Sequence, residues 1–466
     1  MIRPAKPNDS RFVWEIRYNP KININALATE VVDFSEHDKW FKKKYFDNIR
    51  NKCFILSQKT KNVGYCRLDE RGREVFFVSI AIAPSYQGKG YGSVLLRHSI
   101  MKFGVDKNIF AEIKVSNMSS QQLFKKNNFS IYKKNKDIIC FKFKKEKKLN
   151  VAIVGAGRIG AFLDKPGDRN ILTHAHAFTS HGGFKLIGFV DRDFKQAISA
   201  SKIWGGRAYH EVGNLFKNER VDVVCVATPD DTHDRILKIL KNYPLMGVMA
   251  EKPLTNDIKQ SLKLGRDKFW QICPIVVNYS LRYTPGLLHL KEEIIGGKYG
   301  TFICGQGYYG KGLLHNGSHL LDLLSFFGVE VKDFMIVDKI RDYDPTDLSV
   351  SALLHLKGGG LFNLTAVSAR HYTIFEIDLI FTNGRVRILN GGQEIEIFGI
   401  IGDKKFAGYR RLVSQKQIKT GRLNQSMYMA VDNLYNAIVK KDKIVSSVAG
   451  AVKVHKLCFS MQKADI

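Results

Sequence analysis

The sequence lacks the features that mark secreted and membrane proteins. No stretch is long and apolar enough to span a bilayer, and the N-terminal segment MIRPAKPNDS has no apolar run of the signal-peptide kind. The cysteines are odd in number and scattered, and none forms a CxxC pair, at positions 53, 66, 140, 225, 273, 304 and 458. This pattern argues against both a disulfide framework and a zinc site. We therefore predict a reduced, cytoplasmic protein that binds no metal and does not associate with a membrane.

Acidic residues are scarce relative to basic ones. The chain has 73 Lys and Arg against 44 Asp and Glu, and residues 1–150 hold 31 of the former and 14 of the latter. A basic surface attracts nucleic acid, anionic lipid or small anionic substrates. The lysines stand singly or in short runs without interleaved aromatic residues, which is typical of solvated faces. We expect no nucleic-acid partner, and the collection of phosphorylated substrates stays open as a role for the charge.

Apolar runs and turn residues divide the chain into three predicted domains. Residues 1–146 alternate short strands with helical segments, and a charged junction follows at 144–148. Over 149–272, apolar strands alternate with helix-length segments, which predicts a doubly wound parallel sheet of the Rossmann type. Residues 273–466 contain longer alternating strands, which predict a large, mostly antiparallel sheet closed by a helical tail from Ser426. The expected fold class is α/β and α+β, multidomain.

The segment GAGRIG at 155–160 follows a predicted apolar strand and precedes a predicted helix. In that context GxGxxG indicates a dinucleotide site, where Gly157 lets the backbone approach a pyrophosphate at the helix N-terminus. Asp191, at the end of the next strand, is placed to hydrogen-bond the adenosine ribose and disfavour a 2′-phosphate. We therefore expect NAD, while Arg192 keeps NADP open.

Further motifs lie downstream of this loop. They are Ala227-Thr228-Pro229 with Thr232-His233, Glu251-Lys252-Pro253, Tyr283 in NYSLRYTPG, and the segment GSHLLD at 317–322. In this order they resemble the Gfo/Idh/MocA oxidoreductases, over roughly residues 149–466. The resemblance implies that Lys252 and His319 flank the substrate carbon that gives or takes a hydride. A lysine or histidine of tuned pKa suits this chemistry, because the hydroxyl proton must also leave. The implied cofactor-binding residues are Gly155, Gly157, Arg158, Ile159, Gly160, Asp191, Arg192, Thr228, Pro229, His233 and Glu251.

One position departs from the family pattern. Many members have an aspartate four residues before the helix histidine, and here that residue is His315. His315 is expected either to replace the carboxylate in the proton relay or to line the pocket. Asp322, one turn after His319, is expected to orient the imidazole or to bind substrate. Asn278 and Arg282 are further substrate-binding candidates.

A second glycine-rich segment, QGKGYG at 87–92, has a different spacing. It lies between a predicted strand and helix and matches Q/R-x-x-G-x-G/A, and Asn117 follows in VSNMSSQQLFKKNNF. These features resemble the GNAT acetyltransferases over about residues 1–146, and the N-terminal segments resemble members that act on amino sugars. The resemblance implies that acetyl-CoA is bound through its diphosphate by backbone N–H groups. The implied residues are Gln87, Gly88, Lys89, Gly90, Tyr91, Gly92 and Asn117.

Two positions depart from the acetyltransferase pattern. The tyrosine that often protonates the leaving sulfur falls at Phe124, and the usual glycine of the last motif is Asn128, which tolerates left-handed backbone. Alternative proton-handling residues are His37, Glu112, Tyr91 and Tyr132.

Together these motifs predict a bifunctional enzyme of sugar-nucleotide metabolism for surface polysaccharides or glycans. One half would N-acetylate an amino sugar, and the other would oxidise a sugar hydroxyl or reduce a ketone. The partner is then a small sugar nucleotide, and we expect a homo-oligomer formed through the C-terminal sheet. The alternative hypothesis is an oxidoreductase joined to a non-catalytic module that senses acetyl-CoA.

Overall fold

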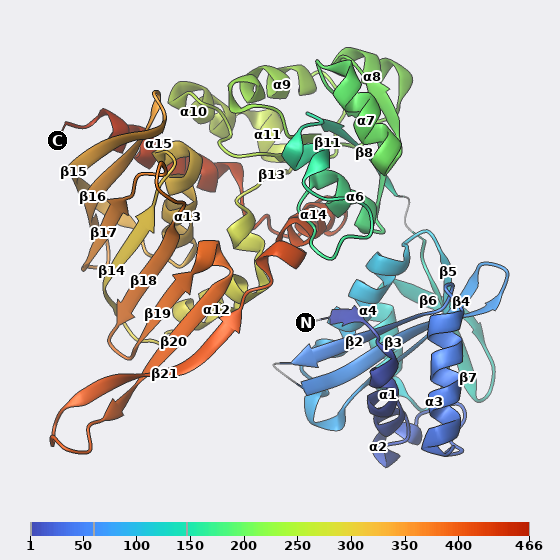
Figure 1. The fold of residues 1–466 in the computed structure, drawn as a ribbon. Coiled ribbons are helices and arrows are strands. Elements are labelled where there is room, and N and C mark those ends of the chain that lie inside the picture. The colour runs from blue at the N-terminus through green and yellow to red at the C-terminus, as the bar shows by residue number, and fades with distance from the viewer. Residues whose placement is uncertain (1, 59–60, 146–147, 466) are drawn as a thin grey trace. The chain divides into compact units, whose positions relative to one another are not determined.

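The computed structural model describes residues 2–58, 61–145 and 148–465. The chain divides into two compact units, Met1–Lys148 with His181–Phe184, and Leu149–Ser180 with Lys185–Ile466. The predicted junction at 144–148 includes residues 146–147, which lie outside the described residues. Figure 1 shows the helices and strands of both units.

The first unit contains a seven-stranded sheet in the order β1-β2-β3-β4-β5-β7-β6. Its strands are β1 (Ile2–Pro4), β2 (Lys52–Gln58), β3 (Lys61–Gly72), β4 (Val75–Ile82), β5 (Asn108–Lys114), β6 (Phe129–Lys134) and β7 (Ile138–Phe143). The parallel strands β4 and β5 pair only over Val75–Phe77 and Asn108–Phe110. Beyond that short ladder the two strands separate, which opens the middle of the sheet.

Helices cover both faces of this sheet, because side chains alternate along each strand. Tyr65 and Ala81 pack with α1 (Ser10–Arg17) and α3 (Phe34–Lys42) in one apolar cluster. On the opposite face, Phe76 contacts Phe103 of α4 (Tyr91–Phe103), with ring centroids 4.6 Å apart. The short helices α2 (Pro20–Asn23) and α5 (Met118–Lys126) complete the unit.

The second unit begins with a six-stranded parallel sheet in the order β10-β9-β8-β11-β12-β13. The strands are β8 (Leu149–Val154), β9 (Phe184–Val190), β10 (Arg207–Tyr209), β11 (Val223–Val226), β12 (Gly247–Ala250) and β13 (Ile275–Val277). The intervening helices are α6 (His174–Ser180), α7 (Phe194–Trp204), α8 (Val212–Asn218), α9 (His233–Leu240), α10 (Ile258–Arg266) and α11 (Lys268–Ile272). The predicted Rossmann sheet is thus confirmed.

The element that directly follows the second glycine loop, where a helix is expected, is short. Only a five-residue π-helical turn, η4 (Arg158–Phe162), follows the loop, and α6 begins at His174. The intervening residues Pro166 and Gly167, the latter at φ 90°, interrupt the helix. The carboxylate of Asp164 fixes the interruption, because it accepts the backbone N–H groups of Leu172 and Thr173.

The rest of the unit is built on an eight-stranded sheet, in the order β15-β16-β17-β14-β18-β19-β20-β21. Its strands are β14 (Phe302–Tyr309), β15 (Val331–Asp344), β16 (Asp347–Leu356), β17 (Leu361–Ala366), β18 (Phe375–Phe381), β19 (Gly384–Leu389), β20 (Glu394–Gly402) and β21 (Arg410–Lys419). Every pair is antiparallel except β14 with β17, which confirms the predicted sheet type. Its helices are α12 (Pro285–Ile295), α13 (Ser318–Phe326), α14 (Arg422–Lys440) and α15 (Val448–Lys463).

Among the described residues, none of the helices is long and apolar enough to cross a bilayer. In the same residues, no group of three or more His, Cys, Asp or Glu side chains is placed to hold a metal ion.

Candidate functional site

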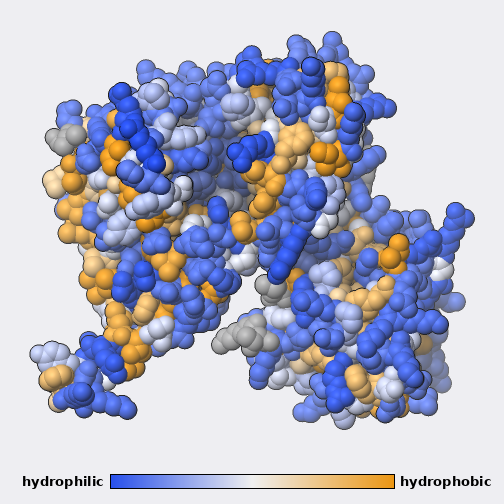
Figure 2. All heavy atoms as spheres, viewed as in Figure 1, coloured by the Kyte–Doolittle hydropathy of each residue, from blue (hydrophilic) through white to orange (hydrophobic). Residues whose placement is uncertain are grey.

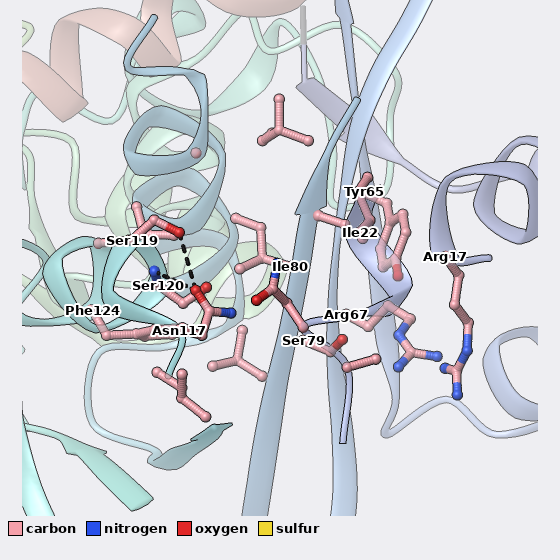
Figure 3. A pocket seen from close by; sticks show the side chains of 18 of the residues that line it. Arg17, Ile22, Tyr65, Arg67, Ser79, Ile80, Asn117, Ser119, Ser120 and Phe124 are labelled. Carbon is pink, nitrogen blue, oxygen red and sulfur yellow. Dashed lines mark hydrogen bonds between the residues drawn. The ribbon is translucent and has the colours of Figure 1, made fainter. Parts of the chain in front are cut away.

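The first candidate site is a cavity of 580 Å³ between the separated strands β4 and β5. Its wall includes Val78–Ile82 of β4, Glu112 of β5, the glycine loop and α5. Figure 3 shows Ile80 and Ser79 between the α5 residues on one side and the end of α1 on the other. The cavity therefore reaches from the glycine loop to the side of the sheet that α1 covers.

The glycine loop leaves its backbone donors available. Gly88 and Gly90 adopt φ of 77° and 80°, where L side chains are strained, and neither would meet an atom within 4 Å if it carried a Cβ. The N–H groups of residues 88–92 donate to no acceptor in the described part of the chain. The Gln87 side chain instead holds the loop, since its Nε2 donates to the Ile82 oxygen at 2.9 Å. Lys89 is exposed and donates to the Ser85 oxygen.

Asn117 and Phe124 lie on α5, at the other wall of the cavity (Figure 3). Asn117 is the N-cap of α5, and its Oδ1 accepts the Ser120 N–H at 3.1 Å and the Ser119 hydroxyl at 3.0 Å. Phe124 is buried and packs edge-on against Phe129 at 4.9 Å. The position that would donate a proton to the leaving sulfur is therefore an apolar ring.

The other proton-handling candidates are dispersed. Glu112 and Tyr91 line the cavity, and Glu112 pairs with Arg71 at 2.7 Å. His37 is buried among the rings of Tyr18, Trp40 and Phe41, where burial above all lowers its pKa to about 4. Tyr132 is exposed on β6 and is not among the cavity residues. Only Glu112 and Tyr91 are thus placed near a cofactor in this cavity.

The second candidate site begins at the loop that follows β8. A Cβ on Gly155 would lie 2.4 Å from the Ala227 oxygen, and one on Gly160 would lie 2.1 Å from the Gly155 oxygen. A Cβ on Gly157 would meet no atom within 4 Å. Gly155 and Gly160 therefore allow tight packing, while Gly157 leaves the open side that a pyrophosphate needs. Arg158 and Ile159 form the first turn of η4.

Asp191 lies directly after β9 and faces this loop. Its Oδ2 accepts the Ala156 N–H at 2.8 Å, and its Oδ1 accepts the Asp193 N–H at 2.9 Å. Each carboxylate oxygen keeps lone-pair capacity for a ribose hydroxyl. Arg192 next to it is exposed.

Two turns at the carboxyl ends of β11 and β12 are joined by His233. This fully buried imidazole contacts the Thr228 oxygen through Nε2 at 2.9 Å and the Pro253 oxygen through Nδ1 at 2.8 Å. His233 therefore positions the Thr228-Pro229 turn and the segment that carries Lys252. Its contacts are made with the protein backbone.

Glu251 lies in a buried ion pair that sequence reasoning missed. Its Oε1 is 2.7 Å from His174 Nε2 and 2.7 Å from Asn278 Nδ2. Burial alone would lower the pKa of His174, but Cys225 and Glu251 outweigh it and raise that pKa to about 10. Burial alone would raise the pKa of Glu251, but His174 and Asn278 lower it. The pair fixes the start of α6 to the end of β12.

Lys252 and two histidines form the titratable centre of the site. Lys252 Nζ donates to the backbone oxygen of His315 at 2.6 Å, and burial lowers the pKa of this lysine. Burial, with Lys252 and Lys311 adding to it, lowers the pKa of His315 to about 4. His319 on α13 has its pKa held well below the usual range by burial, Lys252 and Arg422. Its Nδ1 has no hydrogen-bond partner among the described residues. Both histidines are therefore neutral bases at neutral pH.

Asp322 is paired elsewhere than with His319. Its Oδ2 accepts from Arg282 Nε at 2.7 Å, and both side chains are buried. Arg282 also donates to the Val445 oxygen at 3.1 Å, so this ion pair connects α13 to the C-terminal segment. Within this structure Asp322 and Arg282 bind each other.

Arg422, which no local motif singled out, also belongs to this site. It is the first residue of α14, and burial lowers the pKa of its guanidinium. Its Nε has no partner in the described part of the chain. Its charge lowers the pKa of His319, so this cation acts on the candidate base.

Comparison with family models agrees with this division of the chain. Residues 21–129 match the acetyltransferase (GNAT) family, and residues 149–266 match the oxidoreductase family with an NAD-binding Rossmann fold.

Curated relatives match the second unit in part. An inositol 2-dehydrogenase from Mycolicibacterium vanbaalenii is 26% identical over 252 residues, which cover 51% of this chain and 67% of the relative. One from Rubrobacter xylanophilus is 25% identical over 173 residues, or 35% of this chain and 44% of the relative. A third, from Pseudarthrobacter chlorophenolicus, is 35% identical over 119 residues, which cover 25% of this chain and 32% of the relative. The chain thus spans between about a third and two thirds of these relatives.

Solved structures share the fold of the second unit. A UDP-N-acetylglucosamine 3-dehydrogenase from Acidithiobacillus ferrooxidans superposes with a TM-score of 0.54 at 16% identity, covering 68% of this chain and 97% of that one. An oxidoreductase from Agrobacterium radiobacter, in complex with NAD+, L-tartaric acid and magnesium, has a TM-score of 0.54 at 17% identity. The match covers 68% of this chain and 96% of that one. At such identities the likeness concerns the fold alone.

Proposed function

Because the chain carries a GNAT acetyltransferase domain ahead of a Gfo/Idh/MocA oxidoreductase domain, we propose that it is a bifunctional cytoplasmic enzyme of sugar-nucleotide metabolism. One half oxidises a sugar hydroxyl or reduces the ketone, and the other N-acetylates an amino sugar for a surface polysaccharide or glycan. The names of two similar proteins support this proposal, because one is an inositol 2-dehydrogenase and the other is a UDP-N-acetylglucosamine 3-dehydrogenase.

The oxidoreductase half rests on one observation above the others. Lys252 Nζ donates to the backbone oxygen of His315, four residues before the neutral His319, in the unit whose glycine loop is open at Gly157. NAD, when bound, accepts or supplies the hydride. Lys252 orients the sugar hydroxyl, and His319 takes its proton at the unpartnered Nδ1. Asp191 supports NAD over NADP, because a carboxylate repels a 2′-phosphate.

The acetyltransferase half rests on the cavity between β4 and β5. The free N–H groups of residues 88–92 and the start of α4 suit the diphosphate of coenzyme A. In the reaction the amine nitrogen bonds to the thioester carbon and loses a proton, while the carbon–sulfur bond breaks and the thiolate is protonated. The cavity supplies mainly positioning for these steps.

A test of the proposal measures both activities in the full chain. With a panel of UDP- and CMP-linked sugars, nicotinamide reduction should be detected and should fall about 10²–10⁴-fold in Lys252→Ala, because the proton relay is lost. Acetyl transfer should be unchanged in that variant, which controls for folding. Full nicotinamide reduction in Lys252→Ala would rule out the assigned role.

A second function for the first unit is favoured by Phe124. An apolar ring at the proton-donor position suits a module that binds acetyl-CoA without turning it over. Amine-dependent release of CoA distinguishes the two, because tight CoA binding without release in the whole panel favours the sensor.

We also propose a homo-oligomer through the open face of the large sheet. Strand register places half-exposed or exposed apolar side chains on that face, among them Met335, Leu353 and Leu361. Figure 2 shows hydrophobic side chains at the left edge of the molecule, over this sheet. Sedimentation of the wild type and of Met335→Glu tests it, since a monomeric wild type contradicts the proposal.

A further inference from the structure

Arg67 is a buried cation without full compensation. It lies in the middle of β3, is 5% exposed, and neither its Nε nor its Nη1 has a hydrogen-bond partner in the described residues. The nearest carboxylate oxygen, Asp69 Oδ2, is 3.9 Å from Nη2, beyond hydrogen-bond distance. Burial opposes the charge, but Tyr45 and Asp69 raise the pKa of Arg67, so the guanidinium stays cationic. Unpaired buried donors of this kind are costly unless a ligand meets them.

Arg17, at the end of α1, brings a second guanidinium to the same place. Both side chains line the 580 Å³ cavity, and both lie over the ring of Trp40, at 5.9 Å for Arg17 and 5.2 Å for Arg67. Figure 3 shows the two guanidinium groups next to each other. Two neighbouring like charges repel unless an anion lies between or beside them.

The remaining charges of the cavity wall neutralise this pair only in part, since the Asp69 carboxylate faces Arg67 from 3.9 Å. Arg71 is already paired with Glu112 at 2.7 Å. Asp69 accepts the Tyr45 hydroxyl at 2.5 Å. The other charged residue of the wall, Lys21, adds a further positive charge.

The arginine pair lies on the opposite side of the sheet from α4. Arg67 lies two residues after Tyr65 on β3, so both side chains are on the face that packs against α1 and α3. Arg67 pairs with Ser79 of β4. The glycine loop leads into α4, which packs on the other face through Phe103 and Phe76. The gap between β4 and β5 connects the two faces. A coenzyme whose diphosphate is at the loop therefore leaves the arginine pair to the second substrate.

We propose that Arg67 and Arg17 bind an oxyanion, a phosphate or a carboxylate, of the amine that accepts the acetyl group, and so select anionic amines. This inference rests on the proposed acetyltransferase activity. Guanidinium groups suit it because they pair with phosphate and carboxylate oxygens through two parallel hydrogen bonds.

The test compares amines that share one ring and differ in the oxyanion. The substrates are glucosamine, glucosamine 1-phosphate, UDP-linked glucosamine and glucosaminuronic acid, and the measurement is kcat/KM from CoA release. At least one anionic amine should exceed neutral glucosamine by about 10-fold or more, and the best one identifies the oxyanion. Arg17→Gln and Arg67→Lys should lose about 10- to 100-fold with that amine and little with glucosamine.

A matched control removes a charge from the same helix. Arg11 is exposed on α1 and pairs loosely with Glu15 at 3.5 Å, so Arg11→Gln should retain wild-type preference. The affinity for CoA should stay unchanged in all three variants, which separates the two ends of the cavity. Equal acetylation of glucosamine and the anionic amines, or an unaltered preference in Arg17→Gln, would overturn the inference.

A binding experiment separates this inference from the acetyltransferase proposal. If no amine is acetylated, the full chain saturated with CoA and NAD is titrated calorimetrically with inorganic pyrophosphate. If pyrophosphate binding is lost in Arg17→Gln and kept in Arg11→Gln, the anion site is supported and the acetyltransferase proposal is rejected. Equal binding by wild type and Arg17→Gln rejects the site.

Discussion

The two glycine loops of this chain use glycine for different physical reasons. In the loop at 87–92, Gly88 and Gly90 have positive φ and open space around them, and a 13-residue helix, α4, follows. In the loop at 155–160, Gly155 and Gly160 lie against backbone atoms, and only five residues of π-helix follow. The first loop needs glycine for its conformation, whereas the second needs it for close packing at Gly155 and Gly160, and at Gly155 also for a φ of 100°.

This difference shows what each loop can tolerate. A methyl group added to the first loop strains the backbone and approaches the cofactor, but displaces no protein atom. A methyl group added at Gly160 must displace the backbone of Gly155. Damage to the second loop should therefore reach the fold of its unit, and damage to the first should remain local.

The largest expected effect is that of Gly160→Ala. The added Cβ would lie 2.1 Å from the Gly155 oxygen, so the free energy of unfolding of the second unit should fall by about 3 kcal/mol, with loss of NAD binding. The matched variant Gly157→Ala has open space at its Cβ and should weaken NAD binding while leaving stability within about 0.5 kcal/mol. Denaturant unfolding and NAD titration measure both. Equal destabilisation by the two variants would show that the difference in packing around Gly157 and Gly160 does not determine their effect on stability.

The next effect concerns pH and contrasts the two units. The folded pKa of His174 is about 10, above its ordinary 6.5, so its contribution to stability is complete below pH 6.5 and is lost as pH rises toward 10. The folded pKa of His37 is about 4, so its contribution is complete above pH 6.5 and is lost as pH falls toward 4. His174 should therefore weaken the second unit in base, and His37 should weaken the first unit in acid, as His315 should also do in the second unit.

Hydrogen exchange of peptides from each unit, followed from pH 5 to pH 9, measures this contrast. His174→Gln should remove the alkaline loss in the second unit, while His210→Gln, at an exposed position of the same unit, should keep it. An alkaline loss that persists in His174→Gln would contradict the ion pair with Glu251.

A smaller effect is expected from Phe124→Tyr. The new hydroxyl would supply the proton donor that the cavity lacks, so acetyl transfer should rise about 10-fold if protonation of the sulfur limits turnover. CoA affinity should stay constant, because the loop at 87–92 is not altered. A fall in turnover with unchanged CoA affinity would show that the apolar ring itself is required.

The smallest effect is that of Gly90→Ala. Its φ of 80° costs an L residue about 1 kcal/mol, which corresponds to about a five-fold weaker CoA affinity with little change in NAD binding. Gly213→Ala is the control, because that glycine lies in α8 with open space at its Cβ and should not lower stability. CoA titration of both variants measures this. Loss of NAD binding in Gly90→Ala would contradict the expectation that damage to the first loop remains local.

The sequence predicted the fold well where a local pattern decides it. Alternating apolar residues located the strands, and the turn and glycine spacing distinguished the two loops. The motif around Asn117 identifies this residue from the sequence, and in the structure it is the N-cap of α5. The break after η4 also has a local signal, since Pro166 interrupts a helix and Gly167 adopts a positive φ.

The site residues that were missed depend on contacts between distant segments. His174 meets Glu251 across 77 positions, and Arg422 acts on His319 from another helix. Neither side chain belongs to a motif, so spacing could not identify it. Arg67 had a weak signal, because a lone arginine in the strand GYCRL interrupts an otherwise uncharged run.

The double hydrogen bonding of Asp191 has a consequence for how coenzyme preference can evolve. The carboxylate that would face the ribose also holds the Ala156 N–H, and with it the conformation of the loop. A substitution that makes room for a 2′-phosphate therefore also releases the loop. A change toward NADP at this position alone would therefore also loosen the loop, and a second substitution would be needed to hold Ala156.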